Sequence, residues 1–171
     1  MDADVLMNLL ATGCATEILR ALELTLLAGA TVSGELLYLE SREVTGQREQ
    51  IDFTPAEEAG VLNKVILEDR ELGLVIALAQ LVDDGEAEVI AIALTRGIVM
   101  ATDDRKARRI ALERGASLLS TPELLHRWQD LSSVPAQRMT HVLKLVNRRS
   151  RYRPPTTHSL YDWWMSLLTR S

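Results

Sequence analysis

Acidic residues stand at the points of this chain where an α/β protein usually builds its site. Asp2, Glu35 and Glu86 each lie at or near the start of an expected helix, and Asp103 and Asp104 directly follow a short apolar strand. A single acid in such a place can be explained by the preference of carboxylates for helix N-termini. Asp2, Glu35, Glu86 and Asp104 together, at the carboxyl edge of one sheet, indicate a shared site.

Carboxylates gathered in one cleft repel each other, and a bound divalent cation relieves that repulsion. Their hard oxygen donors suit Mg²⁺ or Mn²⁺. Such a cation polarises a phosphoryl oxygen and lowers the pKa of a bound water, so the reaction needs no Ser, Cys or His nucleophile. The histidines, at positions 126, 141 and 158, all lie outside this acidic site. The residue types therefore favour metal-dependent chemistry on a phosphate ester.

The elements that must position these acids alternate between short strands and helices, which predicts a mainly parallel sheet covered by helices on both faces. Gly97 and Gly115 are placed to end two of the helices. We expect strands at Leu24–Ala28, Gln50–Phe53, Val65–Leu67, Ile98–Ala101 and Ser117–Leu119, and helices over Asp2–Leu10, Cys14–Leu22, Ser33–Leu39, Asp69–Val82, Glu86–Thr95, Asp104–Arg114 and from Thr121.

After Asp130 the character of the sequence changes. A helix is expected over Pro135–Arg148, and the prolines at 154 and 155 must interrupt it before a last helix near Leu160–Leu168. That last helix carries Trp163 and Trp164, an aromatic pair that we expect to anchor it on the core or on a dimer mate. The sequence thus predicts a domain over residues 1–130 and a helical, basic and aromatic arm over residues 131–171.

The composition is that of an ordinary globular protein, with 47% hydrophobic and 25% charged residues among 171. A net charge of −5 excludes a uniformly basic nucleic-acid binder. The single cysteine, Cys14, excludes an intramolecular disulfide and a multi-cysteine zinc site. We find no signal-like segment and no run of eighteen apolar residues, so we expect a soluble cytoplasmic protein without a membrane partner.

Two segments resemble the PIN-domain family, in particular its VapC toxin-like ribonucleases. The opening Asp2-Ala3-Asp4-Val5-Leu6 is similar to the start of that fold, and the more specific match is the block from Asp84 to Arg108, which contains Gly85-Glu86-Ala87-Glu88 and Ala101-Thr102-Asp103-Asp104. The resemblance covers roughly residues 1–125. It implies a three-layer α/β/α sandwich with a short, mainly parallel central sheet, followed here by the C-terminal helical arm.

The same resemblance implies a Mg²⁺- or Mn²⁺-dependent endoribonuclease that acts on RNA as the toxin of a toxin–antitoxin pair. A VapC-like toxin has a cognate antitoxin and often forms a homodimer. Asp2, Glu35, Glu86 and Asp104 would be its catalytic acids and metal ligands, and Thr102 a supporting hydroxyl. Asp103 competes with Asp104 for the metal, and Glu40 is the alternative to Glu35. The sequence departs from the family at its start, where Met1 alone precedes Asp2 instead of a buried apolar strand. It also carries Glu86 where the family more often has Asp.

Basic residues beside and beyond this site favour a polyanionic substrate. Arg105 and Arg109 lie on one face of the helix that begins at the acidic site, where they could contact RNA phosphates. In the arm, Arg148, Arg149 and Arg151 are interleaved with Tyr152, a composition that suits RNA binding but equally an acidic partner protein.

Two other interpretations stay open. The chain could be a catalytically weak or inactive PIN-fold module that binds RNA or protein, a reading that the short N-terminus favours. The motif Asp2-Ala3-Asp4 also resembles that of haloacid-dehalogenase-like phosphatases, with Asp2 as covalent nucleophile and Asp4 as general acid. That reading is weaker, because the chain shows neither the strand before the motif nor a convincing site lysine.

Overall fold

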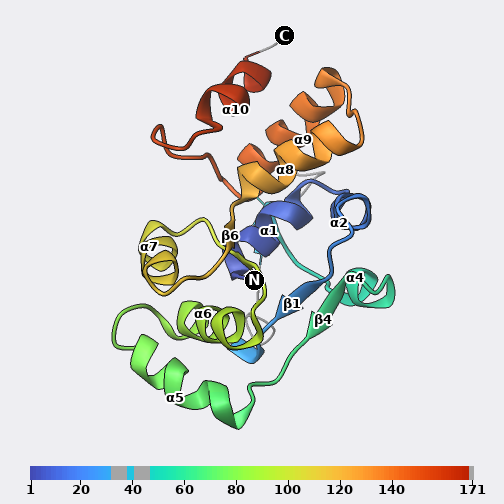
Figure 1. The fold of residues 1–171 in the computed structure, drawn as a ribbon. Helices are drawn as coiled ribbons and strands as arrows, with labels where there is room; N and C mark the ends of the chain where they lie inside the picture. The colour runs from blue at the N-terminus through green and yellow to red at the C-terminus, as the bar shows by residue number, and fades with distance from the viewer. Residues whose placement is uncertain (32–37, 41–46, 170–171) are drawn as a thin grey trace.

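The computed structural model describes residues 1–31, 38–40 and 47–169 (Figure 1). Its strands form three pairs. β1 (Leu26–Ala28) runs parallel to β4 (Leu62–Lys64), β5 (Met100–Ala101) runs parallel to β6 (Leu118–Leu119), and β2 (Tyr38–Glu40) is antiparallel to β3 (Arg48–Gln50). The two parallel pairs lie on either side of the N-terminus (Figure 1).

Helices cover these strand pairs on both sides, as expected for a parallel α/β sandwich. In the view of Figure 1, α2 and α8 lie above β1 and β4, α5 lies below them, and α1 and α6 lie beside the strand pairs. The bounds are α1 Ala3–Ala11, α2 Ala15–Ala21, α4 Thr54–Glu58, α5 Asp69–Leu78, α6 Asp84–Arg96, α7 Arg105–Glu113, α8 Thr121–Leu131, α9 Ala136–Arg149 and α10 Tyr161–Leu168.

Local sequence signals explain where the helices around the site begin and end. The Asp83 side chain caps α6 by accepting a hydrogen bond from the Glu86 amide, and Gly97 ends that helix with φ of 64°. The Asp104 side chain caps α7 at Ala107, and Ser120 forms a capping box with Glu123 at the start of α8. The expected starts of α7 and α8 are therefore confirmed.

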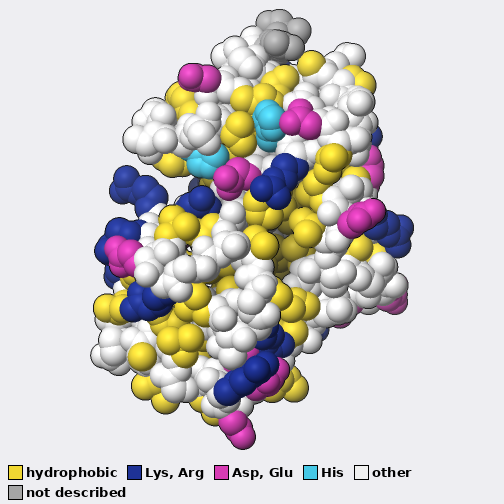
Figure 2. Space-filling view, viewed as in Figure 1, with side chains coloured by type: hydrophobic (Ala, Val, Ile, Leu, Met, Phe, Trp, Pro, Cys, Tyr) yellow, Lys and Arg dark blue, Asp and Glu magenta, His cyan; other side chains and the backbone are white. Residues whose placement is uncertain are grey.

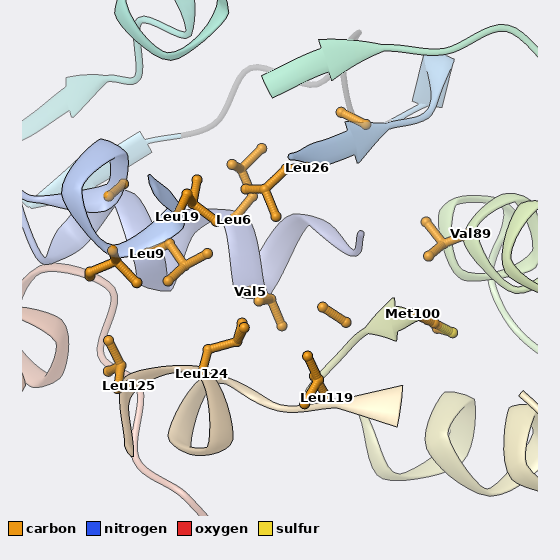
Figure 3. Packing of buried hydrophobic residues seen from close by; sticks show 14 of the residues in the cluster. Val5, Leu6, Leu9, Leu19, Leu26, Val89, Met100, Leu119, Leu124 and Leu125 are labelled. Atoms are coloured by element: carbon orange, nitrogen blue, oxygen red, sulfur yellow. The ribbon is translucent and has the colours of Figure 1, made fainter. Parts of the chain in front are cut away.

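One hydrophobic core joins the arm to the rest of the molecule. Residues from α1, β1, α6 and α8 meet in it, and Figure 3 shows 14 of them, with labels on Val5, Leu26, Val89 and Leu124 among others. Trp164 of α10 is fully buried in the same core, and the Trp163 indole donates a 2.8 Å hydrogen bond to Gln129. These contacts confirm that the aromatic pair anchors the arm. The division at residue 130 stays a prediction.

Three expectations for the middle of the chain were wrong. Residues Tyr38–Glu40 form a strand rather than a helix, because they pair with Arg48–Gln50. β4 lies three residues earlier than expected, because Leu62–Lys64 pairs with β1, whereas the more apolar Ile66 is 85% exposed. Helix α4 was not expected, although Pro55 in its first turn is a helix-start signal. The rest of the helix expected over Ser33–Leu39 lies outside the described residues.

Candidate active site

Asp2 reaches the centre of the molecule between the two parallel strand pairs. The Met1 α-amino group donates to the Leu27 carbonyl at 2.8 Å, and the Asp2 amide donates to the Ala101 carbonyl at 3.0 Å. Asp2 then begins α1 as its N-terminal cap. Burial raises the pKa of the Asp2 carboxyl to about 6, against the opposing effect of a hydrogen bond from Thr102. Burial likewise lowers the pKa of the Met1 α-amino group, to about 6.

Thr102 links Asp2 to Asp104. Its side chain is fully buried, and its Oγ1 donates to Asp2 Oδ2 at 2.8 Å. The same oxygen accepts a hydrogen bond from the Asp104 amide at 3.2 Å. Asp104 Oδ1 in turn accepts from the Ala107 amide at 2.7 Å, which fixes the carboxylate at the start of α7. One buried hydroxyl thus connects the Asp2 carboxylate with the backbone of Asp104, a residue about a hundred positions later in the chain.

Glu86 lies in the first turn of α6, where the charges of Asp2 and Asp104 act on it. Partial burial raises the pKa of its carboxyl to about 7, and the negative charges of Asp104, Asp83 and Asp2 add to the rise. The pKa of Asp4 is also raised, by partial burial and then by Asp103, Asp104 and Asp83. We call Asp2, Asp4, Asp83, Glu86 and Asp104 the acidic group.

The sequence predicted Asp2, Glu86 and Asp104 in this group but did not include Asp4 and Asp83 among the metal-site acids. Asp83 could have been found, because an N-terminal cap three residues before Glu86 must lie at the same helix end. Glu35 lies outside the described residues, and Glu40 belongs to strand β2.

The donors of the acidic group suit a hard cation. They are all carboxylate oxygens, and the pKa of Glu86 is raised by partial burial and then by the negative charges of Asp104, Asp83 and Asp2. Within residues 1–31, 38–40 and 47–169, no three His, Cys, Asp or Glu side chains are close enough together to hold a metal ion in this conformation. The acids of the group therefore influence each other through their charges. A complete set of metal ligands would require movement of their side chains or a contribution from Glu35.

A second acid of α6, Glu88, fixes the segment that leads toward Glu35. Its carboxylate is 2% exposed and accepts hydrogen bonds from the Ala30 amide at 2.9 Å and the Thr31 amide at 3.0 Å. Gly29 permits this approach, because a Cβ atom at that position would lie 2.5 Å from the Glu88 carboxylate. Sequence reasoning gave Glu88 no role, although an acid on an otherwise apolar helix face was the available signal.

Asp103 faces a different environment from its neighbour Asp104. Asn8 Nδ2 and Thr121 Oγ1 donate to its Oδ2, at 3.1 and 2.5 Å. The Thr121 amide and the Tyr152 hydroxyl donate to its Oδ1, at 3.0 and 2.9 Å. Four donors match the acceptor capacity of a carboxylate. Asp103 thus joins α1, α8 and the arm, and this favours Asp104 over Asp103 as the residue available to a metal.

The arginines that the sequence predicts as RNA contacts lie in surroundings that differ from one arginine to the next. Arg105, together with Arg108, lines a pocket of about 280 Å³ between α7 and the arm. Figure 2 shows a hollow in this part of the surface with Lys and Arg side chains around it. Arg109 pairs with Glu113 on the exposed face of α7, at 3.1 Å. Arg148 and Arg151 are exposed.

Arg149 has an internal structural role that the sequence did not predict. It is 6% exposed, donates to the Ala11 carbonyl at the end of α1 at 3.2 Å, and pairs with Glu49. A guanidinium held in this way supports the contact of α9 with α1 and β3 rather than a surface for RNA.

The far wall of the Arg105 pocket is ordered by a chain of hydrogen bonds. The Leu160 amide donates to His158 Nδ1 at 3.0 Å, so a neutral His158 carries its proton on Nε2. That Nε2 lies 3.0 Å from Ser120 Oγ, which donates to Glu123 Oε2 at 2.6 Å. His158, Ser120 and Glu123 therefore hold the arm against the start of α8.

Comparison with known proteins agrees with this arrangement. A family model described as a PIN domain matches residues 1–161, while no curated protein and no solved structure matches the chain. PIN domains are generally nucleases, a class of hydrolases, and typically use divalent metals. In the described part of the chain, no helix has both the length and the apolar character needed to cross a membrane. The chain belongs to the PIN-domain family.

Proposed function

We propose that this protein is a Mg²⁺- or Mn²⁺-dependent endoribonuclease, and the toxin of a toxin–antitoxin pair. The observation that carries the enzymatic part is the acidic group, in which Thr102 sets Asp2 beside Asp104 and the pKa of Glu86 is raised to about 7. The antitoxin and a homodimer follow from the family resemblance alone, and the cytoplasmic location is the expectation drawn from the sequence, which shows no signal-like segment.

Asp2, Glu86 and Asp104 would hold the cation, with Glu35 as the fourth acid. A divalent ion at this site supplies Lewis-acid polarisation of a phosphoryl oxygen and a lowered pKa for water. Thr102 holds the Asp2 carboxylate and the Asp104 backbone amide, while the Ala107 amide holds the Asp104 carboxylate. A rigid support of this kind is what a metal site requires. Glu86 can take up or release a proton near neutral pH, because its pKa lies close to that range.

The RNA would approach across the start of α7. Arg105 and Arg108 line the pocket beside Asp103, and their charges suit backbone phosphates on the way to the acidic group. Arg148 and Arg151 extend the positive charge along the arm. Contacts with phosphates position a strand without reading its sequence, so this surface explains RNA binding but not the choice of a target.

The direct test is cleavage of single-stranded RNA by the purified protein with Mn²⁺, with and without a chelator. We expect cleavage that the chelator abolishes and that Asp104→Asn reduces by at least about 100-fold, more than a typical loss for a residue behind the ligands. Asp84→Asn is the matched control, because Asp84 is exposed and lies beside Asp83 without belonging to the acidic group. Equal cleavage by the wild-type and Asp104→Asn proteins would contradict the proposal.

The alternative is a PIN-fold module that binds RNA or protein and has little or no activity. The absence of a ready metal cage among the described residues favours it. RNA binding without metal-dependent cleavage would establish this alternative. Release of inorganic phosphate from small phosphomonoesters, lost in Asp2→Asn, would instead identify a phosphatase of the haloacid-dehalogenase-like type.

A further inference from the structure

The pocket between α7 and the arm has walls from three parts of the chain. Helix α7 supplies Arg105 and Arg108, the start of α8 supplies Ser120 and Glu123, and the arm supplies residues between Tyr152 and Ser159 (Figure 2). Its volume of about 280 Å³ lies just below the range of about 300–1,000 Å³ that is usual for small-molecule sites. The pocket therefore suits one compact group rather than a length of strand. We call it the arm pocket.

The arm pocket offers a ligand one carboxylate oxygen. Asp103 lines the pocket, but its carboxylate already accepts hydrogen bonds from four donors. Glu123 differs, because the amide and the hydroxyl of Ser120 both donate to its Oε2, at 2.7 and 2.6 Å. Among the described residues, no group donates to Glu123 Oε1. This oxygen is therefore available to an N–H group of a ligand.

A guanidinium group lies beside that carboxylate. Arg108 donates from Nη1 to the Thr102 carbonyl at 3.0 Å, and its Nη2 lies 3.8 Å from Glu123 Oε2. A separation of 3.8 Å is too long for a hydrogen bond, so neither group satisfies the other. Both side chains are partly buried. The arm pocket thus presents a donor and an acceptor side by side, held in place by their other contacts.

The arm supplies a flat surface next to this pair. Both ring nitrogens of His158 are already used, since Nδ1 accepts from the Leu160 amide and Nε2 lies 3.0 Å from Ser120 Oγ. What remains for a ligand is a face of the ring, and Pro155 lines the same wall. Stacking on side chains of this kind is how proteins hold the unpaired bases of single-stranded RNA.

We propose that the arm pocket binds a guanine base, read by Glu123 and Arg108. Their opposite charges favour a neutral ligand over a phosphate, which the Glu123 carboxylate would repel. Guanine offers neighbouring N–H groups at N1 and N2 for a carboxylate, and neighbouring acceptors at O6 and N7 for a guanidinium. Adenine and cytosine have a ring acceptor where guanine has its N1–H, and uracil lacks both N7 and the second N–H group.

The arm pocket lies next to the acidic group. Arg108 donates to the carbonyl of Thr102, whose hydroxyl donates to Asp2. Arg105 is exposed at the rim, where it can contact a phosphate of the same nucleotide. The inference rests on the proposed function in taking RNA as the ligand. Binding of the base requires neither metal nor cleavage, so its failure is distinguishable from failure of the nuclease activity.

The first test varies the RNA and leaves the protein unchanged. Fluorescence anisotropy in EDTA compares an all-uridine octamer with octamers that carry a single guanosine, adenosine or cytidine. We expect the guanosine octamer to bind at least about tenfold tighter than the other three. Inosine, which lacks the N2 amino group, and 7-deazaguanosine, which lacks N7, should each lose part of this preference. Equal binding of the four octamers, or a preference for another base, would overturn the proposal.

The second test inverts the acceptor in the protein. Glu123→Gln keeps an acceptor oxygen for Ser120, and Gln is accepted in a capping box, so α8 keeps its cap. The amide then presents NH₂ in place of Oε1. We expect the guanine preference to fall below about twofold, because a donor would face the guanine N–H groups. Binding of the all-uridine octamer should change little.

Glu113→Gln is the matched control, because Glu113 lies on the exposed face of α7, where it pairs with Arg109. It should keep the full guanine preference. A Glu123→Gln protein that prefers guanosine as strongly as the wild type would overturn the proposal. If that variant does not fold, the inosine and 7-deazaguanosine octamers still decide, because they are measured with the wild-type protein. Wild-type binding that neither analogue weakens would also overturn it.

Discussion

Asp103 and Asp104 are adjacent in the chain, yet their carboxylates have opposite surroundings. Asp103 accepts hydrogen bonds from four donors on Asn8, Thr121 and Tyr152. Asp104 accepts one from the Ala107 amide and otherwise faces the negative charges of the acidic group. A carboxylate surrounded by donors is stabilised as an anion without a cation, whereas carboxylates that face each other need one. The donor-rich region therefore holds the fold together, and the donor-poor region is the one suited to chemistry.

Among the changes that test this difference, removal of the Thr102 hydroxyl should have the largest effect on RNA cleavage. Thr102→Val keeps the shape of the buried side chain but removes the hydrogen bond to Asp2 and the acceptor for the Asp104 amide. We expect RNA cleavage to fall by about 10–100-fold, as for other residues that orient metal ligands. Thr140→Val is the control, because it removes another buried hydroxyl, bonded to the Leu167 carbonyl far from the site. Equal cleavage by the two variants would contradict this role of Thr102.

Loss of charge at Asp103 and at Asp2 should change stability in opposite directions. Asp103→Asn replaces an acceptor oxygen by an NH₂ group and leaves donors of Thr121 or Tyr152 without a partner, which costs about 1–3 kcal/mol. Asp2→Asn removes a carboxylate whose pKa is raised to about 6, so the metal-free protein should become more stable at pH 7. Urea unfolding with EDTA present measures both. Destabilisation of similar size in the two variants would remove the distinction between the regions.

The acidic group should also make the metal-free protein more stable as the pH falls from about 6 to about 5. The folded-state pKa values of Glu86 and Asp2, about 7 and about 6, lie above their ordinary values of 4.5 and 3.8. Folding then favours the protonated forms, so the stability lost at high pH is regained as the pH falls through the folded pKa values. The Met1 α-amino group acts in the opposite sense, but only between its values of about 8 and 6.

Thermal unfolding at pH 6 and pH 5 with EDTA measures this dependence. The double variant Asp2→Asn with Glu86→Gln should lose most of it, and Mn²⁺ should raise Tm more at pH 7.5 than at pH 5, because a cation binds the ionised carboxylates. A Tm that falls between pH 6 and pH 5 in the metal-free protein would contradict the prediction.

The sequence predicted the acidic group better than the donor-rich surroundings of Asp103. Asp104 and Glu86 could be placed because strand ends and helix starts have local signals, such as the apolar run before Thr102 and the turn at Gly85. The difference between Asp103 and Asp104 could not be predicted, because the donors to Asp103 come from residues 8, 121 and 152, far apart in the chain. The same limit explains β2, whose pairing with β3 outweighed a helical pattern.

The internal role of Arg149 has a similar origin. Its position in a basic run, Arg148-Arg149-Ser150-Arg151, suggested a surface for RNA. In the helix α9, however, Arg149 falls on the face that packs against α1, and one position earlier Arg148 is exposed. Composition gave the charge of this segment correctly, but the helix register decided which of its arginines faces solvent.

The arginines of α7 allow the most specific test, with the smallest expected effect. Arg105 lines the pocket beside Asp103, whereas Arg109 is exposed and paired with Glu113. If RNA phosphates follow that pocket, Arg105→Ala should weaken single-stranded RNA binding and reduce the slope of log K against log salt by about 0.7, the value for one phosphate contact on a single strand. Arg109→Ala is matched in charge and helix and should change the slope less, because its guanidinium already has a carboxylate partner. Fluorescence anisotropy in EDTA, which prevents cleavage, gives both slopes, and equal slopes for the two variants would place the RNA elsewhere on the surface.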